Sequence, residues 1–315
     1  MDIYKEETIR RHVSLSKEAL KQMEDAFRRL NEGGVSQPPV IHVNIPEHNG
    51  EADIKTAYIP GFDTFAIKVS AGFFDNPKKG LPSLGGLMLA MDSETGIPRA
   101  LLQDNGYLTD VRTALAGAIA ADQLAVKDIS SVGVIGTGLQ ARLQVEALQL
   151  VRSFHEVHVY GRTPENVKKY QQEMEEKYGL SVRLAESAEE VVRGNDLVVT
   201  TTPAQEPLIK ADWLHDGLHI TAMGSDAEQK QELDPEVFSK ADVVVGDVTS
   251  QVFSIGELQH AKTIVNEDDV TELGQMLSDD ASGRANDQQV TVADLTGTGV
   301  QDTAIANYAL EQIND

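Results

Sequence analysis

The chain has 315 residues, 41% of them hydrophobic, and its 50 acidic and 27 basic residues give a formal net charge of −23. This length predicts about two domains with sizeable cores, and the acid excess, which suggests a salt-tolerant source, excludes nucleic acid and membrane surfaces as natural partners. The absence of cysteine excludes disulfides, thiolate nucleophiles and Cys-ligated metals, and we expect no metal site.

The first 30 residues are predicted to be helical, with Ser16 as a cap and Gly33-Gly34 at the end of the element. They lack the apolar core of a signal peptide, and no apolar run approaches the ~20 residues of a membrane span, so we expect a cytoplasmic protein. Strand-like segments follow at residues 38–46, 52–70 and 85–102. We expect them to form an antiparallel sheet.

Residues 52–70, ADIKTAYIPGFDTFAIKVS, predict a hairpin with an unusual pair of charges. Apolar and polar residues alternate on both sides of a Pro60-Gly61 turn. If residues 60–63 form the loop, Lys55 lies directly opposite Lys68, and like charges so placed destabilise a sheet. We therefore expect an anion to lie between the two lysines. A register that differs by one residue would instead point Lys55 to solvent.

The pattern changes beyond the predicted helix over residues 109–125. From residue 131 onward, apolar strands alternate with helices, which predicts a parallel sheet in an α/β fold. Residues 277–289 are predicted to be a loop. The last helix, over residues 299–313, could return to the first domain.

A glycine-rich turn predicts dinucleotide binding. VGVIGTGLQA, residues 132–141, places Gly136, Gly138 and Ala141 between an apolar strand and a helix. Small residues there let the backbone approach a pyrophosphate, which the N-terminus of the helix stabilises. The alternative is a purely structural turn.

The end of the second strand favours NADP(H), although NAD(H) is possible. An acidic residue that would bind a ribose 2′-hydroxyl is missing from HVYGRT, residues 158–163. Gly161 leaves room there, and Arg162 and Thr163 could bind a 2′-phosphate. The alternative is a solvated arginine in a turn.

Basic residues predict a carboxylate site. Arg112 falls in the first turn of the helix near Thr109, where a cation opposes the macrodipole unless an anion shares the site. With Lys55 and Lys68 it would form an electropositive pocket. Each could alternatively be a surface residue. Asp226 follows a later strand of the parallel sheet and is predicted to be either a helix cap or an acid-base residue.

Several segments together resemble the ornithine cyclodeaminase and mu-crystallin family. They are FAIKVS, DVRTALAGA, GTGLQARLQ, AMGSDAEQKQELDP, SIGELQHA and TGTGVQD, which extend over nearly the whole chain. Residues 57–86 and 101–114 are most similar to the members that serve in ectoine utilisation. The resemblance implies a homodimer and an NAD(P)-dependent reaction at an imine carbon.

The fold class implied is α/β, with a Rossmann-type doubly wound parallel sheet and a discontinuous α+β domain for substrate binding and dimerisation. We expect the latter over residues 1–125 and 299–315 and the NAD(P)-binding domain over residues 126–298.

The resemblance also implies roles for individual residues. Lys68 and Arg112 would hold the substrate carboxylate, Asp226 would be the general acid-base with Lys68 as a second catalytic residue, and Ser83 and Lys230 would line the site beside Lys55. The residues expected to contact the cofactor are Gly136, Thr137, Gly138, Leu139, Gln140, Gly161, Arg162, Thr163, Thr201, Thr202, Pro203, Met223, Gly224 and Val300.

Two departures bear on the substrate. Ornithine cyclodeaminases carry a glutamate where this chain has Lys55, and the carboxylate-binding arginine that the family often has before the hairpin is replaced by His42. We expect an NAD(P)H-dependent imine reductase of a small carboxylate-bearing substrate in ectoine or hydroxyectoine utilisation. The alternatives are an ornithine cyclodeaminase, an amino-acid dehydrogenase such as alanine dehydrogenase, and a non-catalytic NADPH-binding protein.

Overall fold

The computed structural model describes residues 1–314. The chain divides into two compact units: unit 1 comprises Met1–Arg112 and Thr298–Asp315, and unit 2 comprises Thr113–Gly297. The division falls within helix α3 (Tyr107–Leu124) and so assigns residues 113–125 to unit 2.

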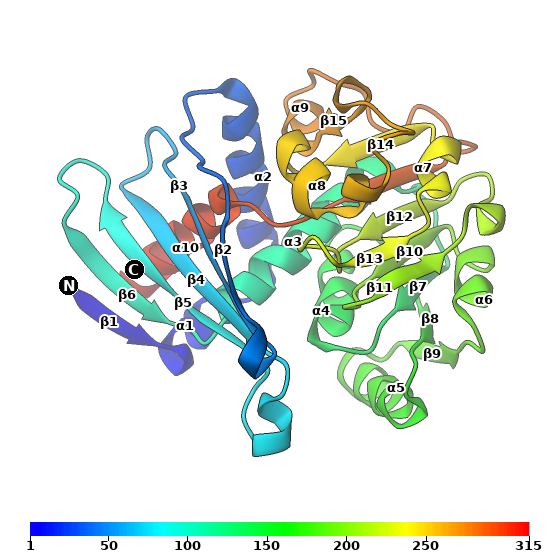
Figure 1. Cartoon of the computed structure of the whole chain (residues 1–315), viewed down its shortest axis with the longest axis horizontal. Helices are drawn as coiled ribbons and strands as arrows, with labels where there is room; N and C mark the ends of the chain where they lie inside the picture. Colours follow the sequence, from blue (N-terminus) through cyan, green and yellow to red (C-terminus); the bar gives the residue numbers. More distant parts are fainter. Residues whose placement is uncertain (315) are drawn as a thin grey trace. The chain divides into compact units, whose positions relative to one another are not determined.

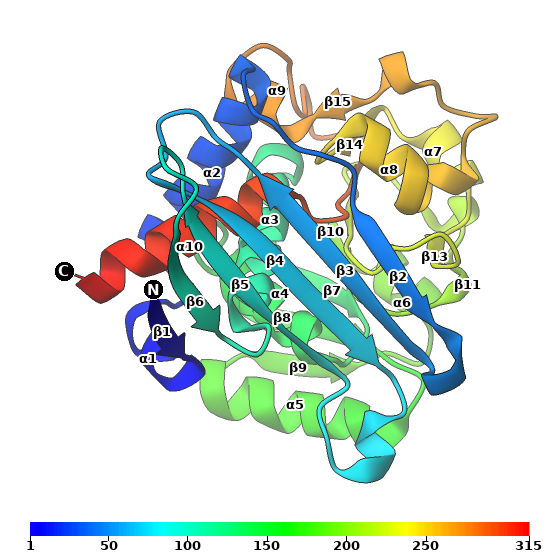
Figure 2. The ribbon, with the colours of Figure 1, turned by 60° about the vertical axis from the view of Figure 1, so that its left-hand side comes forward.

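Unit 1 is built on a six-stranded sheet in the order β1-β6-β5-β4-β3-β2 (Figure 2). Strands β2 to β6 are antiparallel, as predicted, because short connections join each strand to the next. The strands are β1 (Asp2–Lys5), β2 (Ile41–Ile45), β3 (Gly50–Ala57), β4 (Thr64–Phe73), β5 (Leu84–Asp92) and β6 (Pro98–Gln103), with 3-10 turns at η1 (Pro46–His48) and η2 (Asn76–Lys79).

The prediction of helix throughout residues 1–30 is wrong at the start. Asp2–Lys5 forms strand β1, which pairs in parallel with β6 and places Ile3 opposite Leu101. Two helices follow, α1 (Glu6–His12) and α2 (Lys17–Glu32). Ser16 caps α2 as predicted, because its hydroxyl accepts a hydrogen bond from the N–H of Ala19 at 3.1 Å. Strand β1 depends on a partner far along the chain, which local periodicity does not reveal.

Helix α10 (Gly299–Asn314) packs against β3, β4, β5 and α2 and covers what we call the inner face of this sheet (Figure 1). The Thr303 hydroxyl accepts from the N–H of Ala66 at 3.0 Å and donates to the carbonyl of Ala57 at 2.7 Å. At Gly299 a Cβ would lie 2.2 Å from the carbonyl oxygen of Thr56, so only glycine allows this approach. The C-terminal helix therefore belongs to unit 1.

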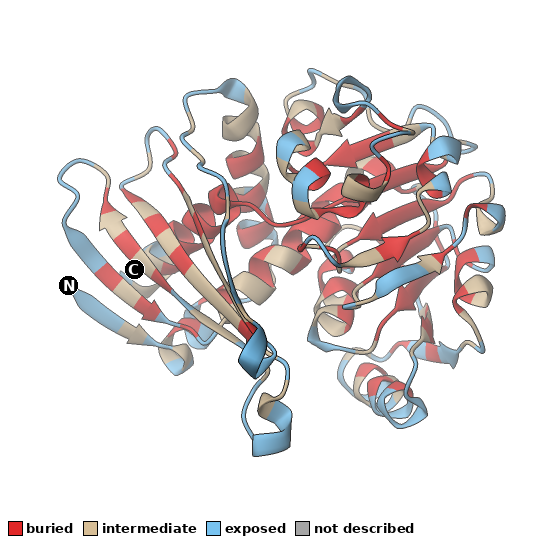
Figure 3. Ribbon diagram, viewed as in Figure 1, coloured by how far each residue is buried: buried red, intermediate tan, exposed pale blue. Residues whose placement is uncertain are grey.

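The opposite, outer face of the sheet carries apolar side chains that are partly or fully exposed among residues 1–314. Buried and partly buried residues alternate along the strands (Figure 3), and the side chains pointing outward are largely aliphatic. None of the members of two cross-strand rows is buried, and Ile3 and Ile41 are each 57% exposed. The rows are Ile3, Leu101, Leu89 and Ile67, and Leu87, Val69, Ile54 and Ile41.

Unit 2 contains an eight-stranded parallel sheet in the order β15-β14-β16-β12-β10-β7-β8-β9, which confirms the predicted α/β class. Near-continuous apolar strands, buried on both faces, favour this arrangement. The strands are β7 (Ser131–Ile135), β8 (Glu156–Tyr160), β9 (Ser181–Leu184), β10 (Leu197–Thr200), β12 (His219–Ala222), β14 (Val243–Gly246), β15 (Thr271–Glu272) and β16 (Thr291–Asp294). A separate parallel pair, β11 (Gln205–Ile209) and β13 (Gln231–Leu233), was not predicted.

Helices cover both faces of this sheet. One apolar core includes residues of α4 and α5, and another includes residues of α6, α7 and α8, as in a doubly wound fold. The predicted loop is confirmed between α9 and β16. The helices are α4 (Leu139–Leu148), α5 (Pro164–Tyr178), α6 (Ala188–Arg193), α7 (Glu236–Lys240), α8 (Thr249–Ile255) and α9 (Leu273–Leu277), with 3-10 turns η3 (Ala211–Trp213), η4 (Glu257–His260) and η5 (Glu267–Asp269).

Candidate active site

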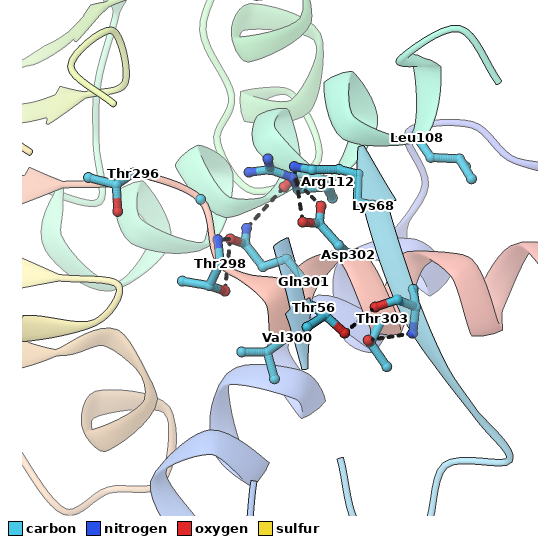
Figure 4. A network of polar contacts seen from close by, with 12 residues as sticks. Thr56, Lys68, Leu108, Arg112, Thr296, Thr298, Val300, Gln301, Asp302 and Thr303 are labelled. Carbon is cyan, nitrogen blue, oxygen red and sulfur yellow. Dashed lines mark hydrogen bonds and ion pairs between the residues drawn. The ribbon is translucent and has the colours of Figure 1, made fainter. Parts of the chain in front are cut away.

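Buried cations surround one carboxylate on the inner face of the unit 1 sheet. The Nζ atom of Lys68 lies 3.0 Å from Oδ2 of Asp302, and Nε of Arg112 lies 3.1 Å from Oδ1 (Figure 4). Lys68 is 1% exposed and Asp302 is 0% exposed. Strand β4, helix α3 and helix α10 each supply one of these side chains. The structure therefore brings together Lys68 and Arg112, which the sequence predicted as neighbours.

The predicted register of the hairpin is confirmed. Lys55 pairs directly with Lys68 in the β3–β4 ladder, and directly opposed residues share a face of a sheet. Lys55 is 6% exposed, so it does not point to solvent. The inner face thus carries a second buried ammonium beside Lys68.

The charge of Lys68 is set by its surroundings. Burial lowers the pKa of its ammonium from 10.5 to about 7; Asp302 opposes this shift, whereas Arg112 and Lys55 add to it. A lysine with such a pKa can exchange a proton near neutral pH. Bound to an anion, it would be held in the charged form.

The first turn of α10 positions Arg112 through its backbone as well as its side chain. Nε2 of Gln301 donates to the carbonyl of Arg112 at 3.4 Å, while Oε1 of Gln301 accepts from the N–H of Thr298 at 2.8 Å. A carboxylate such as Asp302 is also favoured in the first turn of a helix, where it complements the macrodipole.

His42, on strand β2 before the hairpin, is engaged with an acid. Its Nδ1 lies 2.7 Å from Oδ1 of Asp53, its partner in the β2–β3 ladder. Asp53 is two residues from Lys55 on the same strand, so the two side chains share a face. His42 is therefore engaged with a carboxylate of the neighbouring strand.

The glycine-rich turn of unit 2 fits a dinucleotide. Gly136 has a φ of 125°, which glycine adopts without strain, and a Cβ there would lie 2.5 Å from the hydroxyl oxygen of Thr201. At Gly138, the N-cap of α4, a Cβ would meet nothing within 4 Å. Within residues 1–314 no side chain caps α4, so its first N–H groups can bind an anion.

The predicted cofactor residues of unit 2 lie along one edge of the parallel sheet. They follow the carboxyl ends of strands β12, β10, β7 and β8, which are neighbours in the sheet, and ligands of open α/β sheets bind at such ends. Main-chain hydrogen bonds join these ends, from the N–H of Gly136 to the carbonyl of Tyr160 at 2.9 Å and from that of Thr201 to Ile135 at 3.0 Å. The residues so gathered are Gly136, Thr137, Gly138, Leu139, Gln140, Gly161, Arg162, Thr163, Thr201, Thr202, Pro203, Met223 and Gly224.

The end of β8 leaves an accessible guanidinium beside the glycine-rich turn. A Cβ at Gly161 would lie 2.8 Å from Cγ2 of Thr137, so the two loops are in close contact. Arg162 is exposed, and Thr163 is the N-cap of α5. This arrangement can accommodate a phosphate on the ribose.

Asp226 and Lys230 form an ion pair in the loop after β12, with 2.5 Å between Oδ1 and Nζ. The Asp226 side chain is 44% exposed and that of Lys230 is 13% exposed. The hydroxyl of Ser225 donates to the carbonyl of Lys230 at 3.0 Å and closes the loop. Asp226 is thus an accessible carboxylate at the edge of the sheet where the cofactor residues gather.

Of two further predicted residues of unit 1, Ser83 lies away from the basic cluster and Val300 lies within the core. The carbonyl of Ser83 accepts from the N–H of Phe73 at 2.7 Å, five residues along β4 from Lys68, so Ser83 is not adjacent to that lysine. Val300 is buried in the first turn of α10, and its N–H donates to Oε1 of Gln37 at 3.0 Å. Their roles remain predictions.

The sequence reasoning missed Asp302 and Glu232. The Glu232 carboxylate accepts from the N–H of Thr202 at 2.6 Å and from that of Gly224 at 2.9 Å. Burial raises its pKa, and hydrogen bonds from Thr200 and Thr202 oppose the shift. Both acids stand in segments that carry the family resemblance, TGTGVQD and QKQELDP, but only their burial distinguishes them from surface carboxylates.

Residues 1–314 contain no helix long and apolar enough to cross a membrane. Over the same residues, no group of three or more His, Asp or Glu side chains could hold a metal ion.

A dinucleotide-type turn on a parallel sheet, with a cationic site on a second domain, defines a class of dinucleotide-dependent oxidoreductases. A model of the ornithine cyclodeaminase/mu-crystallin family matches residues 1–315, and the chain belongs to this family. A relative from Rhizobium meliloti, described as a dehydrogenase, is 48% identical over 100% of this chain and 96% of its own length. The alanine dehydrogenase of Archaeoglobus fulgidus is 37% identical over 93% of this chain and 89% of its own length.

Solved structures agree with this family assignment. The Δ1-pyrroline-2-carboxylate reductase of Thermococcus litoralis, in complex with NADH and L-proline, matches with a TM-score of 0.94 at 30% identity over 99% of this chain and 97% of that one. An archaeal alanine dehydrogenase dimer with bound NAD matches with a TM-score of 0.92 at 35% identity, over 99% of this chain and 95% of that one. The iminosuccinate reductase of Paracoccus denitrificans, in complex with NAD+, matches with a TM-score of 0.91 at 29% identity, over 100% of this chain and 96% of that one. The protein is therefore an oxidoreductase of this family.

Proposed function

We propose that the protein is an NAD(P)H-dependent reductase that converts a small, carboxylate-bearing imine to the corresponding amine. The observation that carries this proposal is the buried pair of cations, Lys68 and Arg112, on the inner face of unit 1. Burying cations is costly unless anions accompany them. A substrate carboxylate would supply the further negative charge.

The chain's own groups suit binding and proton transfer. Arg112 would bind the carboxylate through its planar guanidinium and Lys68 through its ammonium. The glycine-rich turn and the neighbouring strand ends of unit 2 would hold the dinucleotide, which supplies a hydride when bound. Asp226 would hold or deliver the proton at the imine nitrogen.

NADP(H) is the cofactor we favour. The support is Arg162, an exposed guanidinium directly after the contact between Gly161 and Thr137, where a 2′-phosphate could bind it. The three structures named above contain NAD, NAD+ or NADH, so the preference is a property proposed for this chain alone.

Lys55 restricts the substrate class. A buried ammonium at this position repels the distal ammonium of ornithine and favours a substrate with a second acidic group or an ectoine-type ring carboxylate. We place the reaction in ectoine or hydroxyectoine utilisation because residues 57–86 and 101–114 resemble family members that serve there.

The working form would be a homodimer. Its support is the outer face of the unit 1 sheet, where the side chains of two aliphatic rows are partly or fully exposed. Contiguous apolar surface of this kind commonly marks an interface.

The function can be tested by following the absorbance of reduced nicotinamide with cyclic imino acids, iminosuccinate, pyruvate plus ammonia, and ornithine. We expect oxidation of NADPH with an anionic imine and little conversion of ornithine. Conversion of ornithine to proline without net cofactor oxidation would favour the cyclodeaminase reaction instead.

A variant sharpens this test. Lys55→Glu should reduce activity on the anionic imine and could admit a diamine, whereas Lys79→Glu, a charge reversal in the exposed turn η2, should change neither. Salt is held constant because surface charges are screened. Unchanged kinetics in Lys55→Glu would contradict the proposed substrate class.

A further inference from the structure

Asp302 joins the two cations that would bind the substrate. Its carboxylate is fully buried, and its two oxygens lie against different partners, Oδ2 against Lys68 and Oδ1 against Arg112 (Figure 4). The three residues come from separate elements of unit 1, so no local sequence pattern fixes their meeting. Their arrangement depends on how the first turn of α10 sits on the sheet.

We propose that Asp302 is a positioning residue for the reaction, which holds the Lys68 ammonium charged and orients the Arg112 guanidinium so that both can bind one substrate carboxylate. This inference rests on the proposed function and names a residue to which that function assigns no role. Asp302 would not touch the reacting atoms. It would act through the two cations.

The contacts with Asp302 use only some of the hydrogen-bond donors of each cation. Asp302 accepts from Nε of Arg112, so the two terminal amino groups of the guanidinium can still donate to a carboxylate as an end-on bidentate pair. An ammonium has three donors, and the Asp302 contact uses one of them on Lys68. Asp302 can therefore fix the direction of both cations while each keeps donors for a substrate carboxylate.

The electrostatics of the cluster make the charge of Lys68 depend on this contact. Three groups act on it from the surrounding elements: Asp302 from α10 raises its pKa, whereas Arg112 from α3 and Lys55 from β3 lower it. Its partner on β5 is the uncharged Met88. Asp302 is thus the only one of these groups that favours the protonated lysine.

The variant Asp302→Asn removes the charge with little change of shape, and Glu311→Gln removes a charge from an exposed position of the same helix. In the parent enzyme, kcat/KM for an anionic imine should fall as pH rises through about 7, because Lys68 loses its proton. In Asp302→Asn this fall should begin at least ~1 pH unit lower and KM at neutral pH should rise ~10-fold or more. Glu311→Gln should behave as the parent.

A second readout does not need catalysis. NMR titration of the full-length protein, with a carbon label at the ε position of lysine and the Lys68 signal assigned by Lys68→Arg, reports the protonation of Lys68 directly. We expect a lower midpoint in Asp302→Asn and a midpoint closer to the parent's in Asp302→Glu, which restores the charge. If Asp302→Asn fails to fold, the Asp302→Glu titration and its KM decide.

The outcomes separate the two proposals. Reduction of imines by the parent, together with a Lys68 midpoint and KM in Asp302→Asn equal to those of Glu311→Gln, would overturn the role of Asp302 alone. If the parent reduces no imine but Asp302→Asn still lowers the Lys68 midpoint relative to the parent, the proposed function is overturned and the effect of Asp302 on the charge of Lys68 stands.

Discussion

Lys68 is a buried cation whose protonation can change near neutral pH. Burial disfavours its charge, and the pKa of about 7 reflects that cost after Asp302 has reduced it. Lysine changes its charge readily when buried, whereas arginine does not. Of the two cations in contact with Asp302, Lys68 is therefore the one that can link carboxylate binding to pH.

Asp226 is the residue on which proton transfer would depend. Its carboxylate lies 2.5 Å from the Lys230 ammonium and is partly accessible. Asp226→Asn should keep dinucleotide affinity, because no predicted cofactor contact is removed, and should lower kcat by ~100-fold or more, as expected for a lost proton-transfer group. Dinucleotide titration and steady-state kinetics measure the two effects. Near-normal turnover would reduce Asp226 to a structural residue of its loop.

Arg162 should determine the choice of dinucleotide. Arg162→Ala removes a guanidinium that could bind a 2′-phosphate, so we expect it to weaken NADPH at least ~10-fold and NADH hardly at all. Lys168→Ala, at an exposed position of α5, is the matched control and should affect both cofactors little. Equal weakening of both cofactors, or tighter binding of NADH by the parent, would contradict the proposed preference.

Buried acids organise the strand ends of unit 2. Glu232 accepts main-chain hydrogen bonds from Thr202 and Gly224, which follow strands β10 and β12. Glu257 in turn accepts from the N–H of Glu232 at 2.7 Å. Because these loops contain predicted cofactor residues, we infer that the acids fix the shape of the dinucleotide site from beneath.

Asp294, at the end of β16, gives this group of acids a measurable signature. Burial raises its pKa from 3.8 to about 8, so between those values the unfolded chain releases the proton while the folded chain keeps it. The free energy of unfolding should therefore fall as pH rises from about 4 to 8. Burial likewise raises the pKa of Glu257, to about 9, which extends the trend.

We expect Asp294→Asn to fold and to flatten this dependence. One titrating proton changes stability by at most ~1.4 kcal/mol per pH unit, and the variant should remove part of that slope. Chemical denaturation at several pH values between 5 and 8 gives the slope directly. Asp268→Asn, at an exposed site, serves as the control; a slope in Asp294→Asn equal to that of the control would contradict the buried, protonated state.

The elements differ in how far sequence could predict them. The Lys55–Lys68 register followed from alternation and one short loop, and the turn at Gly136 from local chemistry, because both are short-range features. Strand β1 and the contacts of Asp302 were not predictable, since each depends on segments distant in the chain. The basic residues of the unit 1 site could therefore be predicted from the sequence, whereas their acidic partner Asp302 could not.

At the scale of the whole molecule, the distribution of apolar surface predicts association. The outer face of the unit 1 sheet is the face that an antiparallel sheet usually turns to solvent with polar side chains. Here two cross-strand rows on it are aliphatic. The net charge of −23 opposes association of two copies at low salt. A dimer therefore requires a specific, apolar contact, and we expect salt to strengthen it by screening that repulsion.

Val69 lies at the centre of one of these rows, between Ile54 and Leu87, and Val69→Lys should break the dimer. A lysine there would face its symmetry mate's apolar surface, and burying an unpaired ammonium costs more than the contact supplies. Sedimentation should show the parent at twice the chain mass of 34.2 kDa and the variant as a monomer at micromolar concentration. Leu184→Lys, at an exposed apolar site in unit 2, should remain dimeric. A monomeric parent, or a variant that still dimerises, would show that the outer face is not the interface.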